Sequence, residues 1–292
     1  MLKHARKSPL PPKRVVILGA TGFVGSVIGK RLEADGIAVL GLGSKDIDLA
    51  AGSAAEKLAA VFEPEDALVL VSAIAPCKDP PSLLANIAMG VHVCAAIKAR
   101  SVDHVLYVGS DAVYADDISP LSESSPTAPS GLHGAMHLAR EIMLREAVDA
   151  PLAILRPSVL YGAGDPHNGY GPNRFRRLAA KGETITLFGE GEEMRDHVCV
   201  DDVAEVALLC LLHRSAGILN VATGAAASFR DVAEMVAGHF DKPAPVMATP
   251  RQMPVTHRHF DVTERIRAFP GLSLTPLEEG LARVHREEAE GH

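Results

Sequence analysis

The sequence predicts an α/β fold, a doubly wound parallel sheet with a smaller C-terminal lobe. Short runs of β-branched residues alternate with segments of helical spacing as far as Gly162. Such alternation favours right-handed crossovers, which cover both faces of a parallel sheet with helices. A glycine-rich turn joins the first strand to the first helix, and after Gly162 the chain becomes rich in Gly, Pro and Asn.

The alternating segments are assigned from their periodicity and their end signals. "RVVILGA" at 14–20 is a nearly continuous apolar run, typical of a strand buried on both faces. The first helical segment stops at Gly36, a residue suited to a helix C-terminus. The expected strands are 14–20, 37–43, 67–75, 104–110, 152–162 and 217–223, and the expected helices are 24–36, 52–62, 82–100 and one that starts near His133.

The second half is expected to build the smaller lobe from separated segments. Segment 162–175 is predicted as a loop, and loops at sheet ends often carry binding groups. Segment 183–212 is predicted as a hairpin, a strand and a helix capped by Asp201 or Asp202, and two or three short helices follow Ser228. The larger domain then comprises 13–162 and 190–224, the smaller lobe comprises 163–189 and 225–287, and 1–12 is a disordered basic arm.

Composition narrows the class of protein. The 292 residues are 47% apolar and 22% charged, which is ordinary for a soluble chain that buries a core. The net charge of −7 argues against nucleic-acid or anionic-membrane partners, and we find no run of about 18 apolar residues for a membrane span. The four cysteines form no CxxC pair, so a reducing, cytoplasmic location is expected.

The glycine turn indicates a nucleotide site. Gly19, Gly22 and Gly25 have G-x-x-G-x-x-G spacing between the first strand and the first helix. Glycines there permit a tight turn, close approach of the backbone to a pyrophosphate, and close packing of helix on sheet. The free N–H groups and the dipole of the helix N-terminus favour phosphate. Because the triplet opens an alternating pattern, it predicts a bound dinucleotide.

With further motifs in order, the chain resembles the extended short-chain dehydrogenase/reductase family of nucleotide-sugar epimerases, dehydratases and reductases. The resemblance runs from about Arg14 to about Leu281. "GATGFVG" is similar to the family's cofactor loop, "VSAIA" to its N-A-A-type turn and "VGSDAVYAD" to its S-S-x-x-V-Y-G motif. "LRPSVLYGAGD" is similar to the segment beside the nicotinamide, and "GEEMRDHVCVDDVA" and "RHFD" to segments whose arginines hold the substrate diphosphate.

The resemblance implies a Rossmann-like domain, NAD or NADP as cofactor, a nucleotide-sugar substrate and a homodimer. It implies that Ser110 is catalytic, while His197 is interpreted as packing. Expected cofactor contacts are Gly19, Thr21, Gly22, Phe23, Val24, Gly25, Ser44, Lys45, Asp48, Ser72, Ala73, Ile74, Val108, His137, Pro157, Ser158 and Val159. Expected substrate contacts are Asp111, Ala112, Asn173, Arg195 and Arg258, with His167 as a weaker candidate. From its residue type alone, Arg195 is equally compatible with an ordinary salt bridge.

The helix near His133 departs from the family. The family carries Y-G-x-x-K-x-x-x-E there, and this chain reads "HGAMHLARE", so His133 takes the place of the tyrosine and His137 that of the lysine. A free tyrosine titrates near ~10 and a free histidine near ~6.5, so histidine needs no cationic neighbour to exchange protons at neutral pH. We therefore expect His133 to take a proton from a sugar hydroxyl as hydride leaves its carbon, with Ser110 bonded to the same oxygen. The shorter ring, however, places its nitrogen nearer the backbone than a tyrosine oxygen.

Three interpretations of this pair remain open. His133 is a working acid/base of a sugar oxidoreductase or epimerase, and His137 bonds the cofactor ribose. Alternatively, the site is redox-silent and the protein binds a dinucleotide as a sensor or scaffold. In the third, His133 and His137 hold a metal with Glu141, although no HExxH-type element is present.

Cofactor and reaction type are only partly indicated. NAD-selective members end the second strand with an acidic residue, and here Gly43 or Ser44 stands near that place and Lys45 follows. A lysine at this point is compatible with binding a 2′-phosphate, which makes NADP an alternative cofactor. Asp46 lies close enough to confuse this register, and Lys45 is equally compatible with pointing to solvent. "SDA" at 110–112 lacks the Asp-Glu pair that dehydratases place there, which favours a reductase or epimerase.

Overall fold

A computed structural model of the chain describes residues 1–251 and 254–290. The predicted doubly wound sheet is confirmed: within those residues the main sheet has seven strands in the order β1-β10-β6-β5-β4-β2-β3. All neighbours from β10 to β3 are parallel, and β1 is antiparallel to β10. Their bounds are β1 Lys3–His4, β2 Arg14–Leu18, β3 Val39–Leu42, β4 Asp66–Leu70, β5 His104–Val108, β6 Leu152–Pro157 and β10 Ser215–Val221.

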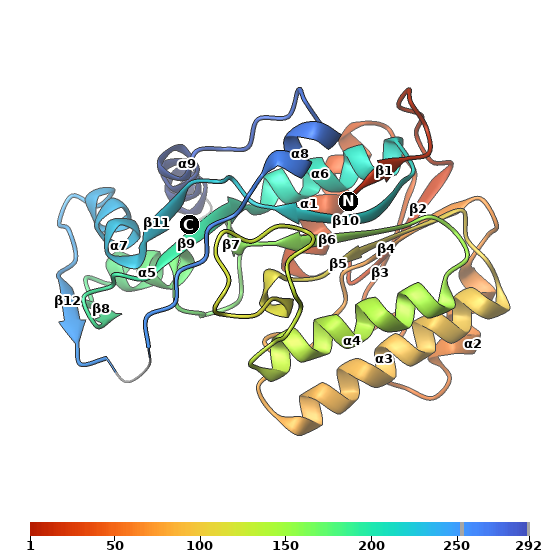
Figure 1. Cartoon of the computed structure of the whole chain (residues 1–292), viewed down its shortest axis with the longest axis horizontal. Helices are drawn as coiled ribbons and strands as arrows, with labels where there is room; N and C mark the ends of the chain where they lie inside the picture. Colours follow the sequence, from red (N-terminus) through yellow and green to blue (C-terminus); the bar gives the residue numbers. More distant parts are fainter. Residues whose placement is uncertain (252–253, 291–292) are drawn as a thin grey trace.

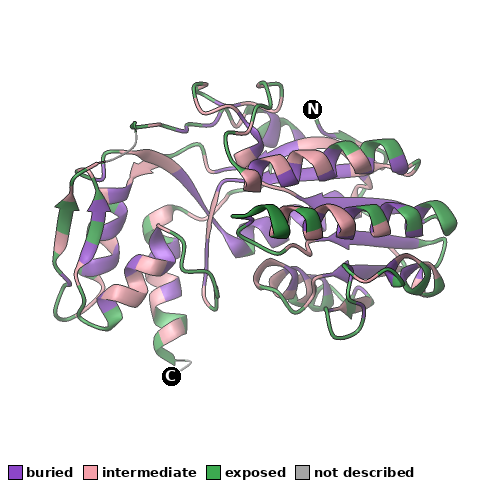
Figure 2. Ribbon diagram, turned by 90° about the horizontal axis from the view of Figure 1, so that it is seen from below, coloured by how far each residue is buried: buried purple, intermediate pink, exposed green. Residues whose placement is uncertain are grey.

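Helices cover both faces of this sheet (Figure 1). On one face, α1 and α6 pack beside each other, and on the other face α2, α3 and α4 form a second layer. Figure 2 shows the buried strands between helices whose outer sides are exposed. The helix bounds are α1 Phe23–Ala34, α2 Ala54–Val61, α3 Pro80–Ala99, α4 Leu132–Ala147 and α6 Val200–Leu212. Strands β2, β4, β5 and β6 are therefore buried on both sides, as continuous apolar runs predict, whereas the edge strand β3 is half-buried.

The smaller lobe is built from short sheets and three helices at one end of the main sheet (Figure 1). One sheet has the order β11-β9-β7 and the other pairs β12 with β8. Its core contains Phe175, Phe229 and Leu281. The bounds are β7 Val159–Tyr161, α5 Pro172–Ala180, β8 Ile185–Phe188, β9 Met194–Cys199, β11 Ala226–Ser228, α7 Phe229–Gly238, β12 Val246–Thr249 and α9 Leu277–Glu290.

Several expectations for the second half were wrong. The expected hairpin at 183–199 does not form, because β8 pairs in parallel with β12 while β9 pairs with β7 and β11. The cap of α6 is Cys199, and Asp201 and Asp202 lie inside the first turn. Asp202 instead accepts hydrogen bonds from the backbone and hydroxyl of Thr275, both at 2.9 Å. The expected strand at 152–162 is divided into β6 and β7 at Ser158.

The predicted disordered arm is also wrong in its first residues. Lys3 and His4 form β1 on the edge of the main sheet, and Leu2 is 0% exposed in its core. His4 is bonded to Ser215 Oγ at 2.8 Å and to the carbonyl of Ala268 at 2.9 Å. An apolar residue and a hydrogen-bonding ring therefore anchor this basic segment.

Two further expectations need adjustment. Contrary to the sequence estimate, α3 is long and apolar enough to cross a membrane, but in the described residues it packs against α2 and α4 over the sheet. The division into two domains stays a prediction. Helix α8, Thr263–Ala268, falls in the range assigned to the smaller lobe, but Ala268 and the following Phe269 pack in the core of the main sheet.

Candidate active site

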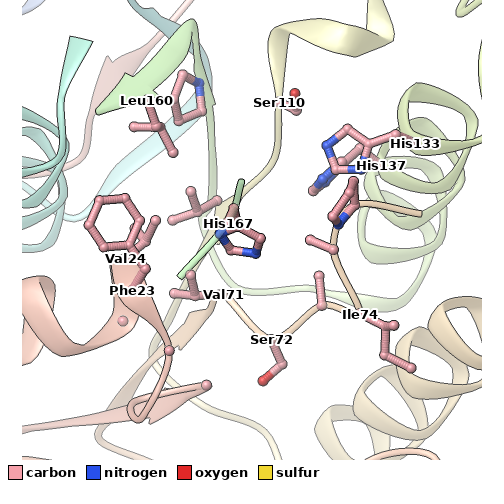
Figure 3. A pocket seen from close by; sticks show the side chains of 18 of the residues that line it. Phe23, Val24, Val71, Ser72, Ile74, Ser110, His133, His137, Leu160 and His167 are labelled. Atoms are coloured by element: carbon pink, nitrogen blue, oxygen red, sulfur yellow. The ribbon is translucent and has the colours of Figure 1, made fainter. Parts of the chain in front are cut away.

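A cavity of about 1130 Å³ opens at the carboxyl ends of the parallel strands. It lies where β2 is flanked by β3 and β4, the point at which strand order reverses, and α/β sheets bind ligands at such points. Side chains from the main sheet and from the smaller lobe both line it, as Figure 3 shows. The expected contacts that line it are Gly19, Thr21, Gly22, Phe23, Val24, Gly25, Ser44, Asp48, Ser72, Ala73, Ile74, Val108, Ser110, Asp111, Ala112, His133, His137, Pro157, Ser158, Val159, His167 and Asn173, whereas Lys45, Arg195 and Arg258 are not among the lining residues.

The glycine loop forms one wall. Gly19 has φ +97°, a conformation that suits glycine. A Cβ on Gly25 would lie 2.1 Å from the Gly19 carbonyl oxygen, so α1 approaches the loop as closely as backbone allows. Gly22 is the N-cap of α1 and offers no side-chain cap. The first amides of α1 therefore face the cavity without a side chain that competes for them.

The end of β3 is fixed by Asp46 rather than by a residue in the cavity. The Asp46 carboxylate accepts a hydrogen bond from the Gly43 amide at 2.8 Å. Ser44 and Asp48 line the cavity, while Lys45 is exposed and does not. Both interpretations of Lys45 therefore stay open, as binding to a 2′-phosphate and as a side chain in solvent.

Gly134 brings the two catalytic candidates together. A Cβ on Gly134 would lie 1.9 Å from the carbonyl oxygen of Ala112, so only glycine permits α4 to pack this closely on η1 (Asp111–Val113). Ser110 caps η1, its hydroxyl accepting from the Ala112 amide at 3.1 Å. Ser110 and His133 consequently share one corner of the cavity (Figure 3).

His133 is half-buried and neutral in character. Burial lowers its pKa below the ordinary value; Asp111 opposes that change and the nearby His167 adds to it. The Cys77 amide donates a long hydrogen bond of 3.4 Å to Nδ1 of His133. The ring also meets that of His137 edge-on, with centroids 4.7 Å apart.

His137 is hydrogen-bonded, on its buried side, to a residue that no local sequence pattern reveals. It is 6% exposed, and its Nδ1 is hydrogen-bonded to the hydroxyl of buried Tyr107 at 2.7 Å. Burial, then the charges of His133 and Arg140, hold its pKa well below the ordinary value. Arg140, only 1% exposed, donates to the carbonyl of Ser72 at 2.6 Å. His137 is thus a neutral residue with one nitrogen already engaged.

The metal interpretation loses its third ligand. Glu141 is 0% exposed and accepts two hydrogen bonds from the guanidinium of Arg156, at 2.9 and 2.6 Å. This carboxylate therefore belongs to a buried ion pair between α4 and β6. No group of three or more His, Cys, Asp or Glu side chains suited to a metal occurs in the described residues.

Arg195 and Arg258 lie near each other but are bound to protein partners. Arg258 donates to the carbonyl of Asp111 at 2.7 Å and to the carboxylate of Asp116 at 2.6 Å. Arg195 donates to the hydroxyl of Thr256 at 2.9 Å. Both guanidiniums are therefore bonded within the protein, and their contact with a substrate diphosphate stays a prediction.

His197 is confirmed as a packing residue. It is 1% exposed, and both of its ring nitrogens are buried without a hydrogen-bond partner among the described residues. The ring meets Phe229 edge-on with centroids 5.8 Å apart. Burial lowers its pKa to about 4, so it is neutral at pH 7.

The loop between β7 and α5 presents a histidine paired with a carboxylate. Nδ1 of His167 lies 2.8 Å from an oxygen of Asp165, and the Asn173 amide donates to the other oxygen at 2.6 Å. Sequence reasoning named His167 and Asn173 but missed Asp165. The D-x-H spacing of 165–167 was the available signal.

Comparison with known proteins places the chain in context. The family model of the "NAD dependent epimerase/dehydratase family" matches residues 15–222. A UDP-glucose 4-epimerase of Mycolicibacterium smegmatis is 29% identical over 93% of this chain and 97% of that protein. A dTDP-6-deoxy-L-talose 4-dehydrogenase (NAD(P)(+)) of Kitasatospora kifunensis is 29% identical over 82% of this chain and 83% of its own length. The solved UDP-glucose 4-epimerase of Thermus thermophilus, in complex with NAD, has a TM-score of 0.84 at 23% identity, covering 95% of this chain and 99% of that one.

Proposed function

We propose that this chain, which belongs to the NAD dependent epimerase/dehydratase family, binds NAD in the cavity and acts on a nucleotide-linked sugar by hydride transfer, as a reductase or an epimerase. One observation carries the proposal: the glycine loop, Ser110 and His133 line a single cavity. The names of the relatives, which act on UDP- and dTDP-linked sugars, support the substrate class.

The residues present fit a nicotinamide dinucleotide. No Cβ fits between α1 and Gly19, so backbone amides can approach a diphosphate there. Asp48 and Ser44 would hold the adenosine end, and the turn at Ser72–Ile74 the middle. Val108, His137 and the segment 157–159 would hold the nicotinamide end. When bound, NAD supplies a carrier that accepts a hydride and returns it.

His133 and Ser110 then act on the reacting oxygen. The Ser110 hydroxyl donates a hydrogen bond to it, and His133 exchanges a proton with it. Because burial lowers the pKa of His133, the imidazole is neutral at pH 7, the state that proton exchange with a hydroxyl requires. Tyr107 positions His137 beside it for the ribose hydroxyls.

The smaller lobe would hold the nucleotide part of the substrate. Asn173, Asp111 and Ala112 line the cavity on this side. Arg258 already donates to the Asp111 carbonyl and to the Asp116 carboxylate. A substrate diphosphate would compete with these groups for the guanidinium, and Arg195 lies close enough to Arg258 to contribute a second positive charge.

A second function is favoured by the Cys77 contact. An amide that donates to Nδ1 of His133 stabilises the neutral ring with its proton on Nε2. That tautomer cannot accept a proton at Nε2. The protein would then bind NAD without redox turnover, as a sensor or scaffold.

Turnover separates the two functions. We expect the purified protein to bind NAD in calorimetry and to convert at least one of a panel of UDP-, dTDP-, GDP- and ADP-linked sugars. His133→Ala should lower kcat by about 10²-fold or more, the usual contribution of a proton-transfer group. Binding of NAD with no turnover on any sugar would support the redox-silent function. A His133→Ala variant with full kcat would remove His133 from the mechanism.

Lys45 is exposed and does not line the cavity, so we expect it to contribute little to cofactor binding and the protein to prefer NAD over NADP. Lys45→Ala should therefore change the Kd of NADP by less than about threefold, as for other surface substitutions within about 0.5 kcal/mol. Calorimetry with NAD and NADP on both proteins checks this. A tenfold loss confined to NADP would show that Lys45 binds the 2′-phosphate.

The predicted homodimer stays part of the proposal. Leu84 and Val91 on α3 and Ile142 on the neighbouring α4 are exposed apolar residues. Burial of such residues favours association through the α3–α4 layer. Light scattering of the purified chain tests this, and a monomer at micromolar concentration would contradict it.

A further inference from the structure

The cavity holds a second histidine with the hydrogen bonding of a general base. His167 extends from the loop between β7 and α5, and in Figure 3 its ring projects into the cavity. The Asp165 carboxylate accepts from the backbone amide of His167 at 3.0 Å and lies 2.8 Å from its Nδ1. It also accepts from the Asn173 side-chain amide at 2.6 Å. A carboxylate is an acceptor only, so Nδ1 of His167 must be the donor.

The loop that carries this pair is anchored on both sides. The Arg177 guanidinium, from α5, donates to the carbonyl of Asp165 at 2.9 Å and also to the carbonyl of His167. Its Nε donates to the Asn168 side chain at 3.2 Å. Asn173 in turn accepts from the Gly162 amide at 3.3 Å. These bonds together fix the backbone on which His167 stands.

His167 and His133 consequently differ in tautomer. A neutral imidazole carries one proton. In His167 that proton is on Nδ1, which leaves the lone pair of Nε2 free for the cavity. In His133 the Cys77 amide occupies the lone pair of Nδ1, so the proton is on Nε2. His167 is an acceptor and His133 a donor, and His167 is close enough to contribute to the lowered pKa of His133.

We propose that His167, oriented by Asp165, is the proton acceptor of this active site, and that His133 is the hydrogen-bond donor to the same substrate oxygen. This assignment rests on the proposed function and divides between two histidines the proton exchange given there to His133. The Cys77 contact is then compatible with redox chemistry, because it leaves the proton of His133 on Nε2, where this reaction needs a hydrogen-bond donor. Asp165 is a positioning residue that fixes the tautomer of His167.

The proton and electrons balance in the oxidising direction. The substrate O–H bond breaks and its proton passes to Nε2 of His167, while the O–H electron pair forms the carbonyl. The C–H bond of the same carbon breaks with both electrons, which the oxidised nicotinamide of the proposed function accepts as hydride. Ser110 and His133 donate to the oxygen throughout. In the reducing direction protonated His167 returns the proton.

The tautomers are measurable without cofactor or turnover. Nitrogen-15 NMR of the imidazoles in the free protein should show His167 protonated on Nδ1 and His133 protonated on Nε2. In Asp165→Asn the amide can donate to Nδ1, so the His167 signal should change to the Nε2-protonated form. His167 protonated on Nε2 in the unaltered protein would overturn the assignment, whatever the variants do.

Kinetics supply the second readout. With the sugar that the unaltered protein converts, His167→Gln and Asp165→Asn should each lower kcat by about 10²–10⁴-fold with a smaller change in KM. The matched control is His285→Gln, on α9 and outside the residues that line the cavity, which should keep full kcat. Either variant with kcat within twofold of the unaltered protein would overturn the proposal.

Failure of this inference and failure of the proposed function are distinguishable. Absence of NAD binding by the unaltered protein would remove the proposed function, and the tautomers would still be read from the NMR spectra. If the unaltered protein converts the sugar and His167→Gln converts it equally fast, the proposed function stands and only the role of His167 is removed. Circular dichroism of each variant establishes that a lost activity is not a lost fold.

Discussion

The glycine-loop wall and the α4 wall face the same cavity but are built on different constraints. At the glycine loop the shape is set by backbone, because a Cβ at Gly25 would lie 2.1 Å from the Gly19 carbonyl. At α4 a close backbone contact at Gly134 brings the helix against η1, apolar residues such as Leu144 pack it on the core, and side-chain bonds hold its buried polar groups. These bonds join His137 to Tyr107 and Glu141 to Arg156.

This difference explains why one wall keeps the family's pattern and the other does not. A backbone cradle accepts only glycine, so its sequence has little freedom. A wall made of side chains can exchange its chemistry while the helix stays in place, provided that the buried partners change with it. The predicted replacement of the tyrosine and lysine by His133 and His137 would be such an exchange, and the groups around the two rings belong to Cys77, Tyr107 and Arg140.

The largest effect is expected from breaking the ion pair that supports the α4 wall. Glu141→Gln leaves the Arg156 guanidinium, 2% exposed, without its counter-charge. Removal of one partner of a buried pair typically costs about 3–5 kcal/mol. Urea unfolding should show a loss of this size, while the control Glu146→Gln, exposed on the same helix, should change stability by less than about 0.5 kcal/mol. If the two variants lose equal amounts of unfolding free energy, the loss in Glu141→Gln does not come from the buried ion pair.

A smaller effect on stability, but a direct one on the cofactor, is expected at the glycine loop. Gly25→Ala forces α1 away from Gly19 and should cost about 1–3 kcal/mol of stability. It should also weaken NAD binding in calorimetry by more than tenfold. Gly29→Ala on the same helix is the control, because its Cβ would meet Ile17 at an ordinary 3.6 Å. Unchanged NAD affinity in Gly25→Ala would show that the cradle does not need this close approach.

The smallest effect is expected at a histidine outside both walls. Because both nitrogens of His197 are buried without partners, His197→Phe should raise the free energy of unfolding at pH 7 by about 1 kcal/mol. The pKa of His197 is lowered to about 4 in the folded protein, so only the unfolded chain gains its proton as pH falls from 6.5. Stability is therefore lost between pH 6.5 and 4, and His197→Phe should reduce that loss. Urea unfolding across this range checks both signs, and an unchanged pH slope would contradict the second.

The sequence predicted features that depend on local pattern. Strand and helix positions in the main sheet follow from apolar runs and from the glycines that end or begin them. These predictions are correct because the spacing of apolar residues along one helix or strand already indicates which side of it faces the core.

Features that depend on pairing between distant segments were not predicted. Strand β8 pairs with β12 and not with β9, its neighbour in the sequence. This pairing depends on packing within the smaller lobe, which the turn between β8 and β9 does not reveal. Tyr107 reaches His137 because β5 lies beneath α4, and no local pattern in either segment states this. Likewise, no local pattern showed that Arg258 bonds to Asp116, because the two residues are 142 positions apart in the sequence.

Arg140 has a consequence for what position 137 can hold. Its guanidinium is buried three residues beyond His137 and, after burial itself, contributes to the lowered pKa of that ring. A lysine at 137 would put a second cation into the same enclosed space. His137→Lys is therefore expected to be better tolerated when Arg140 is neutralised as well.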